Sequence, residues 1–262
     1  MIHESTTLDK LVRRTYGTLL GSGSSVIPEG PMKGLHLAHS EHVSHAHLRG
    51  VYEIEMLEAL DRVLKPGMVC YDVGASIGYI SILMARKARK VYAFEPAPHA
   101  IAEIRRQAAA NNFSNIEVVP LPVSDCVKTV SFQLSDTAYG SRINSVLEER
   151  WKTISFDTTT LDIFASTHEA PDLIKMDIEG EEGRALEGTR KVLSEKQPVL
   201  ICEVHSAEQA DHTGRVLAAC GYKIFHLDGV TPFEPQASQN IVAGMVQVLA
   251  VPDRKVPGGQ RN

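Results

Sequence analysis

The sequence lacks several features that mark other classes of protein. Its 262 residues contain no apolar signal core near the N-terminus and no run approaching the roughly 18 apolar residues of a membrane span. The formal net charge is -5, so there is no basic excess of the kind that nucleic-acid-binding proteins present. We therefore expect a cytoplasmic protein with neither a membrane nor a nucleic acid as its partner.

Cysteine is scarce and shows no paired spacing. The four cysteines, Cys70, Cys126, Cys202 and Cys220, form no Cys-x-x-Cys element. Cys70 and Cys202 lie inside apolar runs, which predicts reduced core thiols rather than disulfides or a zinc site. The remaining composition, 43% hydrophobic and 23% charged, is ordinary for a globular protein with one α/β domain and an extension.

The chain also lacks the usual phosphate-binding loops. No Gly-x-x-x-x-Gly-Lys-Ser/Thr loop occurs, and the loop after the apolar run 68–73 has Gly-x-x-x-Gly spacing, from Gly74 to Gly78, instead of Gly-x-Gly-x-x-Gly. Asp72 precedes this loop, and a carboxylate there would repel a pyrophosphate but suit a cationic group. A second apolar run ends at Glu95, 21 residues after Gly74, near the offset at which an acid binds a ribose diol. The pattern favours S-adenosylmethionine over NAD or ATP.

Strand-like and helix-like segments alternate through residues 66–252. Strands are predicted at 68–73, 91–95, 116–121, 173–176, 198–204, 222–227 and 243–251, and helices at 98–112, 181–193 and 207–219. An extra hairpin is predicted between 127–134 and 153–156, with a mobile loop at 135–150. This alternation predicts a parallel sheet with helices on both faces. The last two strands are joined without a clear helix, which favours an antiparallel insertion at the sheet edge.

Outside this domain we expect an N-terminal extension, residues 1–65, and a flexible tail, residues 253–262. The extension includes a helix at 51–64 and is predicted to serve as a substrate lid. It carries five histidines at short intervals, His36, His39, His42, His45 and His47. Three-residue spacing would place several on one side of a helix, where they could bind metal, although a solvated face or a lid is the favoured interpretation.

Polar residues follow or interrupt two neighbouring predicted strands. Lys175 and Asp177 come at the end of the fourth strand, and Glu203 and His205 at the end of the fifth. Carboxyl ends of parallel strands meet at one edge of a sheet, so we expect these side chains in the same crevice as Asp72 and Glu95. Because burying charges without partners is costly, the Lys175/Asp177 pair predicts a functional role.

Two chemistries remain open at these strand ends. His205, with an ordinary pKa near 6.5, could accept a proton from a substrate hydroxyl, or it could simply cap a helix. Asp177, Glu203 and His205 could instead hold Mg²⁺, but no ligand spacing specific to a metal is present, so a metal-free site is favoured. The acids Glu181 and Glu182 are explained by the helix dipole alone.

Together these motifs resemble those of FkbM-type S-adenosylmethionine-dependent methyltransferases. The resemblance covers roughly residues 48–230 and rests on the segments 50–53, 72–78, 94–96, 175–180 and 203–205. It implies the class I methyltransferase (Rossmann-like) α/β fold: a seven-stranded sheet with helices on both faces and an antiparallel last strand. It also implies O-methylation of a small-molecule hydroxyl, as on a sugar, a polyketide or another secondary metabolite.

The resemblance implies a set of site residues. The implied cofactor-binding residues are Tyr52, Asp72, Gly74, Ala75, Ser76, Gly78, Glu95, Pro96, Ser124, Asp125 and Asp177. Lys175, Asp177, Glu203 and His205 form the candidate catalytic group. Within the first set, the loop would hold the methionine end, Glu95 the ribose, and Ser124 and Asp125 the adenine. Ser76 stands where many relatives carry Asn.

Two other functions are weighed against this one. A non-catalytic adenosylmethionine-binding partner protein would be expected to lose the acids at the strand ends, which are present here. An NAD-dependent oxidoreductase conflicts with the loop spacing and with Asp72. A homo-oligomer is compatible with the sequence, which does not identify the acceptor.

Overall fold

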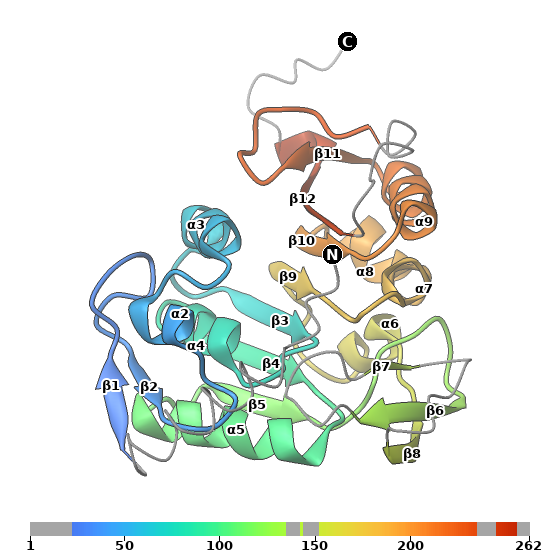
Figure 1. The fold of residues 1–262 in the computed structure, drawn as a ribbon. Coiled ribbons are helices and arrows are strands. Elements are labelled where there is room, and N and C mark those ends of the chain that lie inside the picture. Colours follow the sequence, from blue (N-terminus) through green and yellow to red (C-terminus); the bar gives the residue numbers. More distant parts are fainter. Residues whose placement is uncertain (1–22, 135–141, 144–151, 235–244, 256–262) are drawn as a thin grey trace.

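A seven-stranded sheet forms the centre of the computed structural model, which describes residues 23–134, 142–143, 152–234 and 245–255 (Figure 1). The strand order is β11-β12-β10-β9-β3-β4-β5. The strands are β3 (Val69–Val73), β4 (Lys90–Phe94), β5 (Ile116–Val119), β9 (Leu173–Met176), β10 (Val199–Val204), β11 (Tyr222–His226) and β12 (Val246–Pro252). Within this sheet β12 alone runs antiparallel to its neighbours and lies between β10 and the edge strand β11. The predicted fold class is confirmed.

Helices cover both faces of this sheet (Figure 1). On one face lie α3 (Ile54–Val63), α4 (Tyr79–Ala85) and α5 (Pro98–Ala110), preceded by the short α2 (His45–Arg49). On the other lie α6 (Leu161–Ala165), α7 (Glu182–Glu187), α8 (Arg190–Glu195) and α9 (Ala207–Ala219). Each face has its own apolar core, one with Leu57 and Leu83 and the other with Leu186 and Leu217. Two covered faces explain why the central strands are apolar almost throughout.

The alternation of side chains along β3 positions its one charged residue. Tyr71 and Val73 belong to the core under α6–α9, whereas Cys70 belongs to the core under α3 and α4. By the two-residue period of a strand, Asp72 shares the side of Cys70. There Asp72 is 0% exposed and its Oδ2 accepts a hydrogen bond of 2.5 Å from Ser81 in α4.

The segment predicted as one helix at 181–193 forms two helices, α7 and α8. The break comes at Gly188, where an added Cβ would lie 2.3 Å from the carbonyl oxygen of Ser124. The side chain of Asp162, in the unpredicted helix α6, then accepts hydrogen bonds from the backbone N–H groups of Lys191 (3.0 Å) and Val192 (2.8 Å). This carboxylate caps the first turn of α8, so a tertiary contact overrides the helical pattern.

The described part of the N-terminal extension packs into the core. An unpredicted antiparallel hairpin, β1 (Ser24–Val26) and β2 (His36–Ala38), precedes α2. Ile27, Met32 and Leu37 are fully buried and belong to the same core cluster as α3 and α4. Its role as a substrate lid stays a prediction.

The N-terminal histidines do not share a helix side, so that expectation is wrong. His36 lies in β2, His39 and His42 follow it, and only His45 and His47 lie in α2. Helix α2 has five residues, too few to align the whole run. His47 is buried, is within 2.6 Å of the hydroxyl of Ser44, and stacks on Tyr52 with ring centroids 3.9 Å apart.

Two side-chain amides, from α5 and from the residue that caps its C-terminus, attach β2 to the domain. Gln107 is buried, accepts from the N–H of Ala38 (2.8 Å) and donates to its carbonyl (3.1 Å). Asn111 makes the same pair of bonds to His36, at 2.8 and 2.7 Å. Each amide therefore forms hydrogen bonds with the backbone N–H and C=O of one β2 residue, as a neighbouring strand would. The apolar pattern of the helix did not predict these contacts.

A second small sheet confirms the predicted extra hairpin. In it β6 (Thr129–Leu134) pairs antiparallel with β8 (Lys152–Asp157) and with the short β7 (Arg142–Ile143). Apart from β7, the predicted loop 135–150 lies outside the described residues. The tail begins with a short 3₁₀ helix, Asp253–Lys255, beyond which its residues also lie outside the description.

The structure also bears on the predicted state of the cysteines and on membrane-spanning helices. Cys70, Cys202 and Cys220 are buried free thiols, and Cys126 is exposed and free. No helix among the described residues combines the length and apolar character needed to cross a bilayer.

We expect Gln107→Leu to destabilise the protein. The substitution leaves the buried N–H and carbonyl of Ala38 without their partner, at a cost of about 1–3 kcal/mol. Urea unfolding monitored by circular dichroism measures the loss, and Arg105→Ala, an exposed position on the same helix, should be near neutral. Equal stability of the leucine variant and the wild type would show that the amide does not anchor β2.

Candidate functional site at the ends of β3, β9 and β10

The glycine loop between β3 and α4 directly contacts the end of β9. Gly74 has φ +78°, and a Cβ built on it would lie 1.8 Å from the carbonyl oxygen of Asp177. Gly78 has φ +82°, with Ile104 of α5 3.0 Å from its Cβ position. Only glycine allows both the left-handed backbone and these approaches. The loop and Asp177 thus form one continuous surface.

Glu95 follows β4 and is fixed against this loop. Its carboxylate is 7% exposed; Oε2 accepts from the N–H of Ser76 and Oε1 from the N–H of Ala97, both at 2.9 Å. Burial raises the pKa of Glu95 to about 7, against the opposing effect of these backbone hydrogen bonds. Each oxygen keeps a second lone pair for a ligand hydroxyl. The neighbouring Ala75 and Pro96 are buried beside it.

Lys175 joins the loop to the strand ends. It lies opposite Asp72 in the β3–β9 register and is buried. Its Nζ donates to the Gly74 carbonyl (2.8 Å) and lies 3.6 Å from Asp72 Oδ1 and 3.7 Å from Asp177 Oδ2. Burial alone would lower the pKa of Lys175, but the charges of Asp72 and Asp177 outweigh it and raise that pKa, so the ammonium stays charged.

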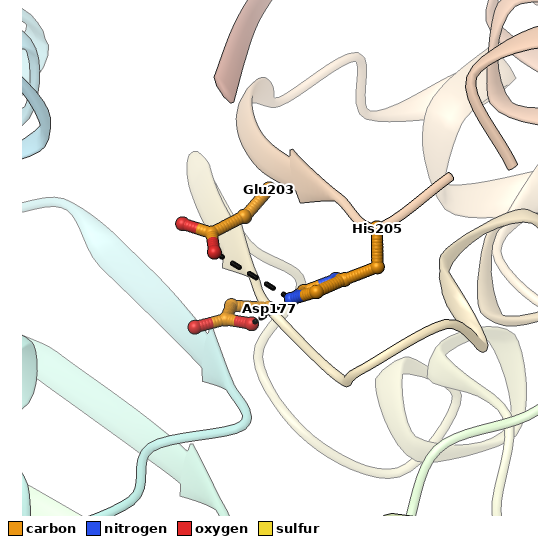
Figure 2. A group of neighbouring side chains, drawn as sticks. All are labelled: Asp177, Glu203 and His205. Atoms are coloured by element: carbon orange, nitrogen blue, oxygen red, sulfur yellow. Dashed lines mark ion pairs between the residues drawn. The ribbon is translucent and has the colours of Figure 1, made fainter. Parts of the chain in front are cut away.

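Asp177, Glu203 and His205 converge where β9 and β10 end (Figure 2). The Nε2 atom of His205 lies 3.6 Å from Asp177 Oδ1 and 3.5 Å from Glu203 Oε1. One ligand atom from each residue lies within 4.8 Å of the others. Glu179, in the turn after β9, places Oε2 3.7 Å from the same Nε2. The structure therefore brings together all four residues predicted to carry chemistry, because Lys175 already contacts Asp177.

Glu182 orients the ring of His205. Its Oε1 lies 2.8 Å from His205 Nδ1 and also accepts from the N–H of Gly180 at 2.9 Å. Glu182 is 0% exposed, so the dipole interpretation of this acid is incomplete. Burial alone would lower the pKa of His205, but the hydrogen bond to Glu182 and the charges of Glu182 and Asp177 raise it to about 9. The expected base with a pKa near 6.5 is thus a protonated imidazole at neutral pH.

Glu53 is a further site residue that the sequence interpretation did not assign. It precedes α3 with φ +48°, an uncommon conformation for a residue other than glycine. Burial and the charge of Asp177 raise the pKa of Glu53 to about 7, while a hydrogen bond with Tyr52 opposes this. The sequence signal for this role was its position directly after Tyr52, an implied cofactor-binding residue. An acid before an amphipathic helix, however, is also common simply because it favours the start of a helix.

Ser124 and Asp125 lie after β5, apart from these contacts. Ser124 is buried and its hydroxyl donates to Asp125 at 3.1 Å. A hydrogen bond from Lys128 (2.7 Å) lowers the pKa of Asp125 to about 2. Their predicted place beside adenine stays a prediction, as do the cofactor contacts of Tyr52 and Asp72.

The sheet order, its antiparallel strand and the glycine loop followed by a ribose-type acid define the class of S-adenosylmethionine-dependent class I methyltransferases. The family model described as "Methyltransferase FkbM domain" matches residues 72–224, more than half of the chain, which therefore belongs to that family. The resemblance inferred from the motifs is confirmed.

Individual relatives are more distant or match short stretches. A solved FkbM methyltransferase from Methylobacillus flagellatus is 20% identical, with 80% of this chain and 55% of that one covered and a TM-score of 0.44. The precorrin-6y C5,15-methyltransferase of Geobacter metallireducens is 12% identical, with 76% and 87% covered and a TM-score of 0.46.

Curated relatives match over even less of their length. An uncharacterised protein of Methanocaldococcus jannaschii is 34% identical over 61 residues, which are 23% of this chain and 24% of the relative. An uncharacterised RNA methyltransferase of Bacillus cereus is 48% identical over 46 residues, 18% of this chain and 10% of the relative. The chain thus spans a quarter or less of the length of these two relatives.

The site residues fit S-adenosylmethionine chemically. The fixed carboxylate of Glu95 suits two ribose hydroxyls, and the glycine loop leaves room for close backbone approach at the cofactor's methionine end. Asp177 places negative charge beside this loop, and Glu53, with a pKa of about 7, adds to it as the pH rises. A sulfonium and an ammonium require such charge. None of these groups suits a pyrophosphate, which the same carboxylates would repel.

We expect Glu95→Gln to weaken S-adenosylmethionine binding tenfold or more. Charge-assisted hydrogen bonds to the ribose are worth roughly 1.5–3 kcal/mol, and calorimetric titration measures the loss. Glu117→Gln, an exposed acid in β5, is the matched control. Unchanged affinity in a folded Glu95→Gln variant would remove this carboxylate from the site, and binding of NAD instead would contradict the cofactor assignment.

The same carboxylate should make wild-type affinity depend on pH. The pKa of Glu95 is about 7 without cofactor, and the diol favours the ionised form, so binding lowers this pKa and releases a proton. Affinity should therefore be full above pH 7 and fall by up to about tenfold per pH unit below it. Titrations at several pH values should show this slope in the wild type and a smaller slope in Glu95→Gln, where Glu53, with a pKa of about 7, still titrates.

Proposed function

We propose that this protein transfers the methyl group of S-adenosylmethionine to a hydroxyl oxygen of a small molecule. The observation that carries the proposal is the gathering of Asp177, Glu203 and His205 directly beside the glycine loop that contacts Asp177. A methyl acceptor must meet the donor at this place, and hydrogen-bonding groups stand there to orient a hydroxyl and receive its proton.

The residues divide the work by position. Bound S-adenosylmethionine supplies a methyl group on a positively charged sulfur, which keeps the electron pair when the C–S bond breaks and the new O–C bond forms. Lys175 holds the Gly74 carbonyl and so fixes the loop. Asp177 and His205 orient the hydroxyl, and its proton passes to one of them and then to water.

His205 must lose its own proton before it can act as the base. Carboxylates raise the pKa of His205 to about 9. One of them, Asp177, also lies beside the glycine loop, where the positively charged sulfonium of the methyl donor is expected. A cation beside Asp177 offsets these carboxylates and lowers the pKa of the imidazole. Asp177, which is partly exposed and lies beside His205, is the alternative acceptor of the hydroxyl proton.

The charges of the site favour a small molecule over a nucleic acid. Asp177, Glu179 and Glu203 lie together at its centre, and a phosphate backbone would be repelled there. The net charge of -5 acts in the same direction. The short match to an RNA methyltransferase covers 10% of that protein and does not outweigh these charges.

A non-catalytic adenosylmethionine-binding partner is less consistent with the site. Such a protein needs the loop and Glu95 but has no use for the charged groups that Lys175 and Glu182 hold in place. Burying charged side chains such as Asp177 and His205 costs free energy, so their presence supports a catalytic role. An oxidoreductase function with NAD is disfavoured by the carboxylates beside the loop.

We expect Asp177→Asn and His205→Ala each to lower turnover by about 10²–10⁴-fold, the range for loss of a general base, and to lower the affinity for S-adenosylmethionine far less than turnover. Screening small hydroxyl compounds for methyl transfer from radiolabelled donor identifies an acceptor, and steady-state kinetics and calorimetry then measure the two quantities.

Surface residues of α9 provide matched controls. Asp211→Asn and His212→Ala remove the same chemical groups from partly exposed positions and should leave turnover near that of the wild type. Near wild-type turnover in both site variants, measured with the true acceptor, would mean that Asp177 and His205 are structural. Methylation of amines or RNA but of no hydroxyl compound would contradict the acceptor class.

A further inference from the structure

We propose that Asp177, Glu203 and His205 form a binding site for a first-row divalent cation, with one imidazole nitrogen and two carboxylate oxygens as protein ligands. The sequence offered no ligand spacing specific to a metal and favoured a metal-free site. The arrangement of these three side chains (Figure 2) and the contacts of their neighbours give three reasons for the other choice.

The first reason is the separation of the ligand atoms. Nε2 of His205 lies 3.6 Å from Asp177 Oδ1 and 3.5 Å from Glu203 Oε1. These separations are too long for hydrogen bonds. Ligands about 2.1 Å from one cation are about 3.0 Å apart at right angles and about 3.4 Å apart in a tetrahedron. These two separations are therefore close to those within a coordination shell, and one ligand atom from each residue lies within 4.8 Å of the others.

The second reason is the orientation of the imidazole. Glu182, wholly buried and held by the N–H of Gly180, takes the Nδ1 side of His205 at 2.8 Å. With Nδ1–H donated to this carboxylate, Nε2 faces Asp177 and Glu203, and an incoming cation would displace the proton on Nε2 and take its lone pair. A carboxylate behind a histidine is the usual support of a metal-binding imidazole, because it fixes the tautomer and increases the basicity of the ligand.

The third reason is the environment of Glu203. This residue is 6% exposed, and Gln247 holds its Oε2 with a hydrogen bond of 2.5 Å. Its Oε1 faces Nε2 and accepts no hydrogen bond from the described residues. A carboxylate so deeply buried is costly unless a positive charge offsets it. Lys175 does not fill this role directly, because its Nζ bonds to Gly74 and contacts Asp72 and Asp177. The imidazolium of His205 offsets Glu203 in part, and a divalent cation in its place would do so with twice the charge.

The mixed donor set indicates the kind of cation. An imidazole nitrogen suits Fe²⁺ or Zn²⁺, and the two carboxylates also suit Mn²⁺, whereas Mg²⁺ and Ca²⁺ prefer oxygen donors. Three protein ligands also leave coordination positions open, as catalytic sites do and closed structural sites do not. If the proposed function holds, an acceptor hydroxyl can take an open position, where a divalent cation lowers its pKa and eases loss of its proton.

Direct binding of Mn²⁺ tests the site without methyl donor or acceptor. The protein is stripped with EDTA, dialysed and titrated with Mn²⁺, while electron paramagnetic resonance reports the free ion. We expect one equivalent to bind, and excess Zn²⁺ to compete better than Mg²⁺. Asp177→Asn, Glu203→Gln and His205→Ala should each weaken binding at least tenfold.

Two further variants separate ligation from folding. Glu182→Gln keeps all three ligands but removes the carboxylate behind the imidazole, and should weaken Mn²⁺ binding about 10–100-fold. His212→Ala removes a surface histidine that pairs with Glu187 and should bind as the wild type does. Circular dichroism verifies that each variant is folded.

Absence of binding to the wild type up to about 1 mM Mn²⁺, a very weak affinity, would overturn the proposal. So would binding that the ligand substitutions leave unchanged. S-adenosylmethionine binding to the stripped protein is measured in parallel, since its loss would count against the proposed function and not against the cation site. EDTA-sensitive turnover restored by Mn²⁺ would connect the two.

Discussion

The buried ammonium group of Lys175 is the contact on which the rest of the site depends. It donates to the Gly74 carbonyl and pairs with Asp72 on one side and Asp177 on the other. Without it, Asp72 would be a fully buried carboxylate held by the hydroxyl of Ser81, and its Oδ1 already lacks a hydrogen-bond partner among the described residues. Such an uncompensated buried charge is strongly destabilising. One cation thus holds the loop, the strand β3 and the end of β9 in a fixed relation.

This arrangement links the two halves of the site. The glycine loop touches Asp177 through its backbone, and Lys175 links them through its side chain, so neither can shift alone. Glu53 approaches the same charges from the start of α3, which belongs to the N-terminal part of the chain. The surface beside the loop is therefore assembled from segments more than 100 residues apart in sequence, on one face of the sheet.

The features predicted correctly from the sequence are those with a local cause. Apolar runs such as 68–73 end at small or charged residues, and the parallel topology then places Lys175, Asp177 and Glu203 at one edge without further information. The features that were missed depend on distant partners. The pattern of α5 did not show that Gln107 binds the backbone of Ala38, and nothing near Gly188 showed that Asp162 would cap α8.

Glu182 is a site residue whose role the sequence also did not reveal. It contributes to the negative charge of the candidate site. At the start of α7 it is indistinguishable in sequence from a residue that complements the helix dipole. Once folded, it is buried behind His205, and with Asp177, Glu179 and Glu203 it makes the strand ends strongly anionic. Carboxylates so arranged repel phosphates and attract cations. The same field that excludes a dinucleotide from the glycine loop therefore favours a sulfonium donor beside Asp177 and a divalent cation between Glu203 and His205.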